Sequence, residues 1–510
     1  MKKIFNRKAL IIAALSILTL SSCEREYLDQ YPTTSIGYDP ATATVDNLAN
    51  VINGMHRNMY VRQNSSQGQN GGTAVLIYMD ILGEDVIFPS TGNGWFVSML
   101  RWQDVNNANS SNLFYPYRFY YSQINNANIV INKAPEASGD SNLRDRIMGE
   151  AYAFRAYAYS MLVQIYGKRY IPGQDNKQLG VPLRLDETIN AIPRATVEEV
   201  YKQINSDLAK ASELLKGKSR LSKSHFNYNV VRGLMARVAL TQGNYNEAAT
   251  YAKEARQGFD LMTPEVYKKG FNDNQVPEWM WGYDIIETQS DYFGNFMAYM
   301  SRNYNSTQIR SAPKVMNSKL YSLFPSTDVR TQVVDPNGDH VGLLSDIDPA
   351  TGKPKKKSEY ANYSLFKYTS QKFTVENLNS SLGDIPFMRA AEMYLIEAEA
   401  LARAGKEAES KAVFAQLESK RNPAYKASAN TGAAYITEIL NSRRLELWGE
   451  GFRFLDLKRL SLPLDRTGAN VVTSVVNNVM TVPADDKKWT WLIPQSEIDN
   501  SEGLVVQNEL

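Results

Sequence analysis

The chain has 510 residues, of which 43% are hydrophobic and 22% charged, and its formal net charge is +2. This composition excludes an intrinsically disordered chain and a polytopic membrane protein, and predicts a globular body with a sizeable core. Because the sequence holds only three histidines and one cysteine, a zinc cluster of Cys and His ligands and a framework of disulfides are also excluded.

The amino-terminal segment has the pattern of a bacterial signal peptide. Four basic residues precede an apolar run at 9–20, which is too short to span a bilayer as a helix. The sequence then reads Leu20-Ser21-Ser22-Cys23, which resembles the cleavage box of bacterial lipoproteins. We therefore expect residues 1–22 to be removed and Cys23 to be lipidated, so that acyl chains anchor the protein to a membrane. A chance cysteine beside an ordinary cleavage site is the alternative.

Removal of the signal peptide reverses the sign of the net charge. Residues 1–22 contain four basic and no acidic residues, so the 56 basic residues fall to 52 against 54 acidic ones, a net charge of about −2. The basicity of the whole chain therefore gives no support to nucleic-acid binding. Residues 23–45 are polar and rich in turn formers, and we expect a tether with little regular structure there.

Two long stretches, 60–125 and 265–385, lack a helical period and are rich in Gly, Asn, Ser, Pro and aromatic residues. They are predicted to be loop insertions in a single domain that covers residues 46–510. Loops of this length in a compact protein are usually functional.

Helical signals occupy the remaining chain, at about 142–257 and 388–460. In 142–167 the apolar residues advance by three or four positions, so that they share one face, and Gly167 ends the run. Thr196 and Glu199 form a capping box that opens a helix reaching about Leu215. The stretches 227–257 and 388–421 each predict a pair of helices around a turn, at Gly243 and Gly405, which resembles a tetratricopeptide repeat. A last helix is predicted at about 437–460.

Sequence signatures of catalysis are absent. The chain has no nucleophile elbow, no P-loop, no zinc-protease motif and no dinucleotide fingerprint, and His56, His225 and His340 lie far apart along it. We expect each histidine to be structural or exposed, and we expect no metal site and no cofactor. Two acids placed in space would suffice for glycoside hydrolysis, and the nearest cluster is Asp80, Glu84 and Asp85. Local packing of that cluster is the favoured interpretation.

The predicted last helix combines charged and large apolar side chains. Equal numbers of acids and bases beside bulky apolar residues favour a partly buried ion network over an active site. The charged residues concerned are Arg443, Arg444, Glu446, Glu450, Arg453 and Asp456.

Several segments together resemble the SusD/RagB family of outer-membrane lipoproteins from Bacteroidota. They are the cleavage box at Cys23, the tether EREYLDQYPTTSI, the helix GEAYAFRAYAYSMLVQIYG, the run RRLELWGEGFRFLDLKRL and the tail WLIPQSEIDNSEGLVVQN. The resemblance implies a mostly α fold in which tetratricopeptide-like helix pairs form a right-handed superhelical scaffold with long irregular loops. It also implies a surface lipoprotein without catalytic activity, which captures a glycan and delivers it to a SusC-like TonB-dependent transporter. Glu24-Arg25-Glu26 interrupts the acidic run typical of outward-facing lipoproteins, so a periplasmic orientation stays open.

A glycan binder needs exposed aromatic planes beside amide, carboxylate or guanidinium groups, because a sugar presents an apolar face ringed by hydroxyls. The stretches 93–104 and 279–304 combine these residue types. Packing in the core is an equally open alternative for each aromatic ring except Trp95, for which the surrounding glycines and polar residues favour exposure. The candidate ligand-binding residues are Trp95, Asn93, Arg101, Trp281, Tyr292 and Tyr299.

Three other functions remain open at this level. The same fold binds peptide in the RagB branch, a surface glycosidase would use paired acids such as Asp80 and Glu84, and a helical scaffold would contact protein alone. A ligand screen and an assay for new reducing ends separate these alternatives from glycan capture.

Overall fold

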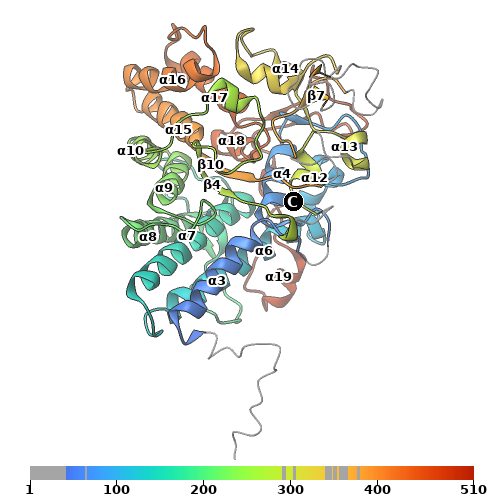
Figure 1. The fold of residues 1–510 in the computed structure, drawn as a ribbon. Coiled ribbons are helices and arrows are strands. Elements are labelled where there is room, and N and C mark those ends of the chain that lie inside the picture. Colours follow the sequence, from blue (N-terminus) through green and yellow to red (C-terminus); the bar gives the residue numbers. More distant parts are fainter. Residues whose placement is uncertain are drawn as a thin grey trace, which may run out of the picture.

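The computed structural model describes residues 42–63, 66–289, 294–302, 306–338, 347–348, 353–354, 366–375 and 380–509. In this part of the chain the fold is mostly helical (Figure 1). The longer helices are α3 (Val45–Asn58), α4 (Gly71–Ile81), α6 (Ser111–Lys133), α7 (Ser141–Tyr166), α8 (Val197–Leu215), α9 (Tyr228–Gln242), α10 (Tyr245–Ala255), α15 (Ala390–Arg403), α16 (Glu407–Arg421), α17 (Gly432–Glu446), α18 (Arg453–Leu460) and α19 (Gln495–Asn500). The short helices are α5 (Val97–Leu100), α11 (Pro264–Tyr267), α12 (Met297–Met300), α13 (Thr307–Ser311) and α14 (Ser318–Tyr321).

The strands are short and pair antiparallel. The longest pair joins β4 (Trp279–Tyr283) to β10 (Ile385–Arg389), with Ile385 opposite Tyr283. A four-stranded sheet has the order β1-β5-β9-β6, and three further pairs are β2 with β3, β7 with β8, and β11 with β12. The bounds are β1 Val86–Ile87, β2 Leu179–Pro182, β3 Arg194–Thr196, β5 Val315–Met316, β6 Val334–Asp335, β7 Ile347–Asp348, β8 Lys353–Pro354, β9 Thr369–Ser370, β11 Leu464–Asp465 and β12 Thr481–Val482.

The predicted helix pairs are present. Gly243 and Gly405 take left-handed φ values of +75° and +78°, which lets α9 turn directly into α10 and α15 into α16. The capping box of Thr196 and Glu199 opens α8, and α7 ends before Gly167. Consecutive helices pack from α6 through α10 to α15 and α16, along one side of the molecule in Figure 1. The right-handed superhelix that the resemblance implies stays a prediction.

The prediction of a loop insertion at 60–125 is wrong in part. This stretch contains α4 and the first half of α6. Every residue of α4 is buried, so the helix has no solvent-facing side of polar residues. Its sequence therefore shows no helical period. Helix α6 contains Pro116, and the hydroxyl of Tyr166 enters its hydrogen-bond ladder by accepting from the Tyr117 N–H and donating to the Leu113 carbonyl.

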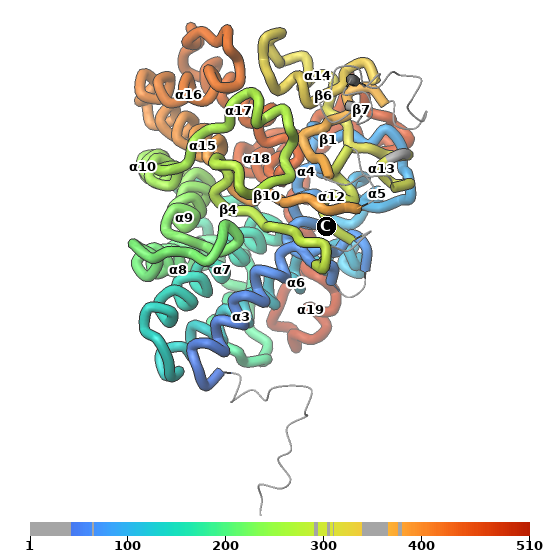
Figure 2. The backbone as a smooth tube through the Cα atoms, viewed as in Figure 1, coloured from blue at the N-terminus to red at the C-terminus, as the bar shows by residue number. Residues whose placement is uncertain are grey.

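The prediction of one last helix at 437–460 is also wrong, because α17 and α18 are separate. Gly449 and Gly451 have φ values of +79° and +87°, and the chain turns between the helices. The carboxylate of Asp80, on α4, accepts the N–H groups of Gly451, Phe452 and Arg453 and so caps the start of α18. Figure 2 shows α18 beside α4, although nearly 400 residues separate them in the sequence.

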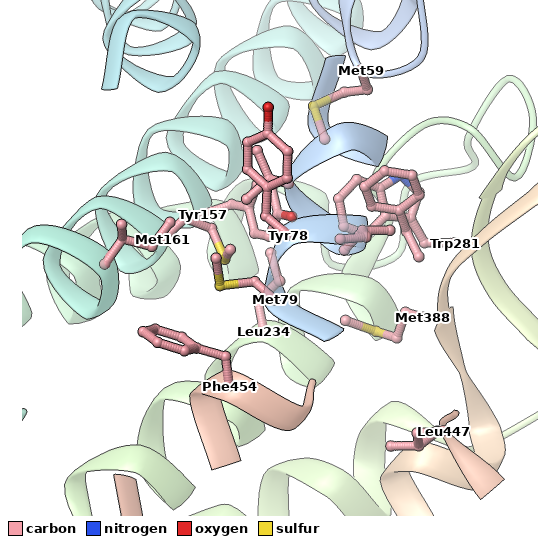
Figure 3. Packing of buried hydrophobic residues seen from close by; sticks show 14 of the residues in the cluster. Met59, Tyr78, Met79, Tyr157, Met161, Leu234, Trp281, Met388, Leu447 and Phe454 are labelled. Atoms are coloured by element: carbon pink, nitrogen blue, oxygen red, sulfur yellow. The ribbon is translucent and has the colours of Figure 1, made fainter. Parts of the chain in front are cut away.

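The core is rich in aromatic and methionine side chains from both halves of the chain. Figure 3 shows Met59, Met79 and Tyr157 gathered with Trp281 and Phe454, which come from different parts of the sequence. Among the described residues, no helix combines the length and apolar character needed to cross a membrane.

The ion network predicted around the last helical segment is confirmed, and it is larger than predicted. Arg389 and Arg421 are fully buried, and Glu446 lies between them, 2.9 Å from Arg389 Nη1 and 3.0 Å from Arg421 Nε. Glu278, directly before β4, bonds both arginines, at 2.5 and 2.8 Å. This network ties together β4, β10, α16 and α17.

Candidate functional site

The acidic cluster Asp80, Glu84 and Asp85 is buried and bonded within the protein. Asp80 caps α18, and burial raises its pKa to about 7. Glu84 bonds Arg453, and Asp85 bonds Arg444 with Oδ1 2.5 Å from Nη2. All three acids are at most 6% exposed. The structural interpretation of this cluster is confirmed, and these carboxylates are not open to a substrate.

Two histidines that are distant in sequence meet at one carboxylate. His56 Nε2 lies 2.6 Å and His225 Nδ1 lies 2.9 Å from Oε2 of Glu150 on α7. Burial lowers the pKa of His56 to about 4. Burial opposes ionisation of Glu150 too, but the hydrogen bonds from the two imidazoles outweigh it and lower the Glu150 pKa to about 2.

The same three side chains form a group that could hold a metal ion, since their ligand atoms lie within 4.8 Å of one another. In this structure the imidazole nitrogens already bond the carboxylate, so the group joins α3, α7 and the segment before α9. The contact between His56 and His225 was not predicted, because local sequence patterns carry no information about residues 169 positions apart. His340 lies outside the described residues.

Trp95 lies on an exposed turn between β1 and α5. Gly92, Asn93 and Gly94 are exposed, Trp95 is partly exposed, and the glycines have φ values of +50° and +86°. The turn is held against α13, because the Asn93 N–H donates to Oε1 of Gln308 at 3.1 Å and the Ser90 hydroxyl donates to the Ser311 carbonyl at 2.5 Å. The aromatic ring is therefore presented on an anchored turn.

The ring of Tyr299 packs beside both Trp95 and Phe96. Phe96 is buried and meets Tyr299 edge to face, with centroids 4.8 Å apart, and Tyr299 also lies 6.5 Å from the Trp95 ring. Gly68 approaches both Trp95 and Phe96. Because neighbouring rings already hold the partly exposed indole in place, it can stack against a flat ligand without a further loss of side-chain freedom.

Gln308 is a neighbour of this turn that sequence reasoning missed. Its Oε1 is used by Asn93, whereas its Nε2 is buried and has no hydrogen-bond partner among the described residues. Because Nε2 is buried, it is not accessible to a ligand, and Gln308 serves to hold the turn that carries Trp95. No sequence pattern signals this residue, since 215 positions separate it from Asn93.

The other predicted ligand residues that the structure describes are bonded within the protein or buried. Arg101 is partly exposed, but its Nε and Nη2 donate to the carbonyls of Val475 and Ser474. Arg101 therefore holds the segment that contains these two residues. The expectation of an exposed ring is wrong for Trp281 and Tyr299, which are 0% and 2% exposed. Trp281 belongs to β4, whose five residues are all buried (Figure 3). Tyr292 and Cys23 lie outside the described residues.

Comparison with known proteins identifies relatives over most of the chain. A family model described as "Starch-binding associating with outer membrane" matches residues 26–240, and a model described as "SusD family" matches residues 262–510. SusD-like protein P2 of Formosa agariphila is 25% identical over 503 residues, covering 91% of this chain and 93% of the relative.

Solved structures share the fold. A SusD-like carbohydrate binding protein from Bacteroides vulgatus aligns with a TM-score of 0.75 at 24% identity, over 90% of this chain and 97% of that one. A laminarin binding SusD-like protein aligns with a TM-score of 0.64 at 19% identity, over 91% and 98% of the two chains.

Proposed function

This chain belongs to the SusD/RagB family, a carbohydrate-binding family associated with the outer membrane, and from that premise we propose that it captures a glycan at the cell surface. The observation that carries the proposal is Trp95, a partly exposed indole held on an anchored turn beside exposed Asn93. In the proposed site the indole stacks on a sugar ring, the exposed Asn93 bonds its hydroxyls, and Gln308 holds the turn that carries both residues. Because binding alone accounts for these groups, we propose capture without turnover.

Replacing Trp95 by alanine is expected to weaken glycan binding about 10- to 100-fold, because loss of one stacked ring removes roughly 1.5–3 kcal/mol. Trp95→Phe should retain most of the affinity, since it keeps an aromatic face. The dissociation constants would be measured by titration calorimetry on the protein lacking residues 1–23, against a panel of glycans that includes laminarin.

Leu221→Ala is the matched control, because Leu221 is 62% exposed on a different loop. Unchanged affinity in a folded Trp95→Ala variant would remove Trp95 from the site. Binding of peptides alone would favour the RagB-like alternative, and new reducing ends in the glycan assay would contradict capture without turnover.

We further propose that residues 1–22 are a signal peptide, that Cys23 carries the lipid anchor and that a tether follows it. The predicted end of this tether at residue 45 is too late, because Thr44 caps α3 and Val45 is buried. The apolar run at 9–20 and the small residues before Cys23 support the signal peptide and the anchor. Wild-type protein in a Bacteroidota host should incorporate radiolabelled palmitate and remain with the outer membrane, and Cys23→Ala should lose the label. Ser21→Ala, which keeps a small residue before the cysteine, should retain it. Unlabelled wild-type protein released into the medium would contradict the anchor.

The proposed destination of the captured glycan is a SusC-like TonB-dependent transporter, for which this lipoprotein acts as a lid. Support comes from family membership. Purification of the tagged, full-length protein from detergent-solubilised outer membranes should recover a β-barrel partner in stoichiometric amount. Recovery of the lipoprotein alone would argue against the partnership.

A further inference from the structure

One face of α6 carries aromatic and amide side chains that the Trp95 site does not use. Phe114, Tyr117, Tyr121, Asn125 and Asn128 recur every three or four residues and therefore share one side of the helix. They line a cleft of about 370 Å³. Its other walls are the segment from Arg184 to Thr188 and Glu497 of α19, which lies beside α6 in Figure 1.

The walls of this cleft are preorganised by hydrogen bonds. Tyr121 donates its hydroxyl to the Pro182 carbonyl at 2.7 Å, and Asn128 Nδ2 donates to the Asp186 carbonyl at 2.9 Å. Asn128 is itself held by Arg155, whose guanidinium pairs with Asp207 on α8. The 184–188 segment is thus fixed opposite α6.

Tyr117 places a buried phenol at the cleft. The residue is 3% exposed, and its hydroxyl lies near the side chains of Tyr121 and Glu497. Burial, with a smaller contribution from the Glu497 carboxylate, raises the pKa of Tyr117 well above its usual value, so the phenol stays protonated and can both donate and accept.

The chemistry of the lining selects the kind of ligand. Arg118 and Arg184 are balanced by Asp186 and Glu497, so the cleft does not favour an anion or a cation. Along the helix three aromatic residues are followed by two asparagines, and aromatic faces beside amide and hydroxyl groups suit a neutral sugar. A volume of 370 Å³ lies at the lower end of the roughly 300–1,000 Å³ typical of ligand pockets, which fits one or two pyranose rings.

We propose that the cleft between α6, the 184–188 segment and α19 is a second carbohydrate-binding site, separate from the Trp95 turn. The choice of a sugar rests on the proposed glycan function. A second site on the same molecule would hold another part of a long glycan and raise the overall affinity through a higher effective concentration.

The test uses Ser122→Trp, which introduces a large ring at an exposed position that lines the cleft. Ser206→Trp is the matched control, because Ser206 is an exposed serine in the middle of α8. Both substitutions are made in the Trp95→Ala background, on the protein lacking residues 1–23. The probes are laminarihexaose, cellohexaose and xylohexaose, followed by saturation-transfer difference NMR and titration calorimetry.

We expect residual binding of at least one hexasaccharide to the Trp95→Ala protein, an at least tenfold loss on adding Ser122→Trp, and no loss on adding Ser206→Trp. Tyr117→Phe, which deletes only the hydroxyl, should weaken the residual binding severalfold. If Ser122→Trp leaves the residual binding unchanged, the second site is overturned. It is also overturned if Trp95→Ala alone abolishes all glycan binding. Neither outcome contradicts the proposed function. Absence of glycan binding to the wild type, with binding of peptides, overturns the proposed function and the second site together.

Discussion

Replacing Glu446 by glutamine is expected to lower the free energy of unfolding by about 3–5 kcal/mol, among the largest effects of any single substitution in this protein. Glu446 is fully buried and bonds Arg389, Arg421 and Arg330. These arginines hold the pKa of Glu446 well below its usual value despite its burial. Glutamine keeps the shape but removes the negative charge, so three buried guanidinium groups lose a shared counter-ion.

Urea denaturation at pH 7, followed by circular dichroism, measures this loss. Glu213→Gln is the matched control, since Glu213 pairs with Lys210 on the surface of α8 with a side chain 72% exposed, and no measurable change is expected there. A change below about 1 kcal/mol for Glu446→Gln would mean that the buried network does not depend on this charge.

The substitution Gly71→Ala is expected to destabilise the fold by roughly 2–5 kcal/mol, from the sum of a left-handed backbone and a steric overlap. Gly71 begins α4 with a φ of +61°. A Cβ atom there would lie 2.3 Å from the Asn58 carbonyl oxygen and 2.3 Å from the carbonyl carbon of Met59. Because the obstructing atoms are backbone, α3 and α4 would have to separate.

Gly54→Ala is the control for this prediction. Gly54 lies inside α3, is exposed and has open space where the Cβ would be. Alanine should stabilise the helix there by about 0.5–1 kcal/mol. The two melting temperatures should therefore move in opposite directions. An unchanged or higher melting temperature for Gly71→Ala would show that the α3–α4 contact tolerates a side chain at Gly71.

Local patterns in the sequence predicted the helix pairs well. The capping box at Thr196, the turn at Gly243 and the end of α7 at Gly167 depend on residues within a few positions of one another. Such interactions are visible in the sequence because helix periodicity and capping operate over three or four residues. Helix α4 escaped prediction because a helix buried on all sides has no polar face to reveal its period.

The candidate site was predicted only in part. Composition and spacing indicated which segments carry aromatic and polar side chains together, and the glycines and polar residues around Trp95 favoured its exposure. They did not predict that Trp281 is buried. Trp95 is partly exposed because its turn projects from β1 and is held by Gln308, whereas Trp281 is buried because β10 and the neighbouring helices cover β4.

The signal-peptide pattern, the helix pairs and the resemblance to the SusD/RagB family follow from contiguous residues and were therefore predictable. Three features depend instead on the packing of distant segments: the cap of α18 by Asp80, the contact of His56 and His225 with Glu150, and the accessibility of each aromatic ring. Contacts between distant segments depend on how whole elements pack, and the exposure of a ring depends on what covers it. Neither property can be read from the residue and its near neighbours alone.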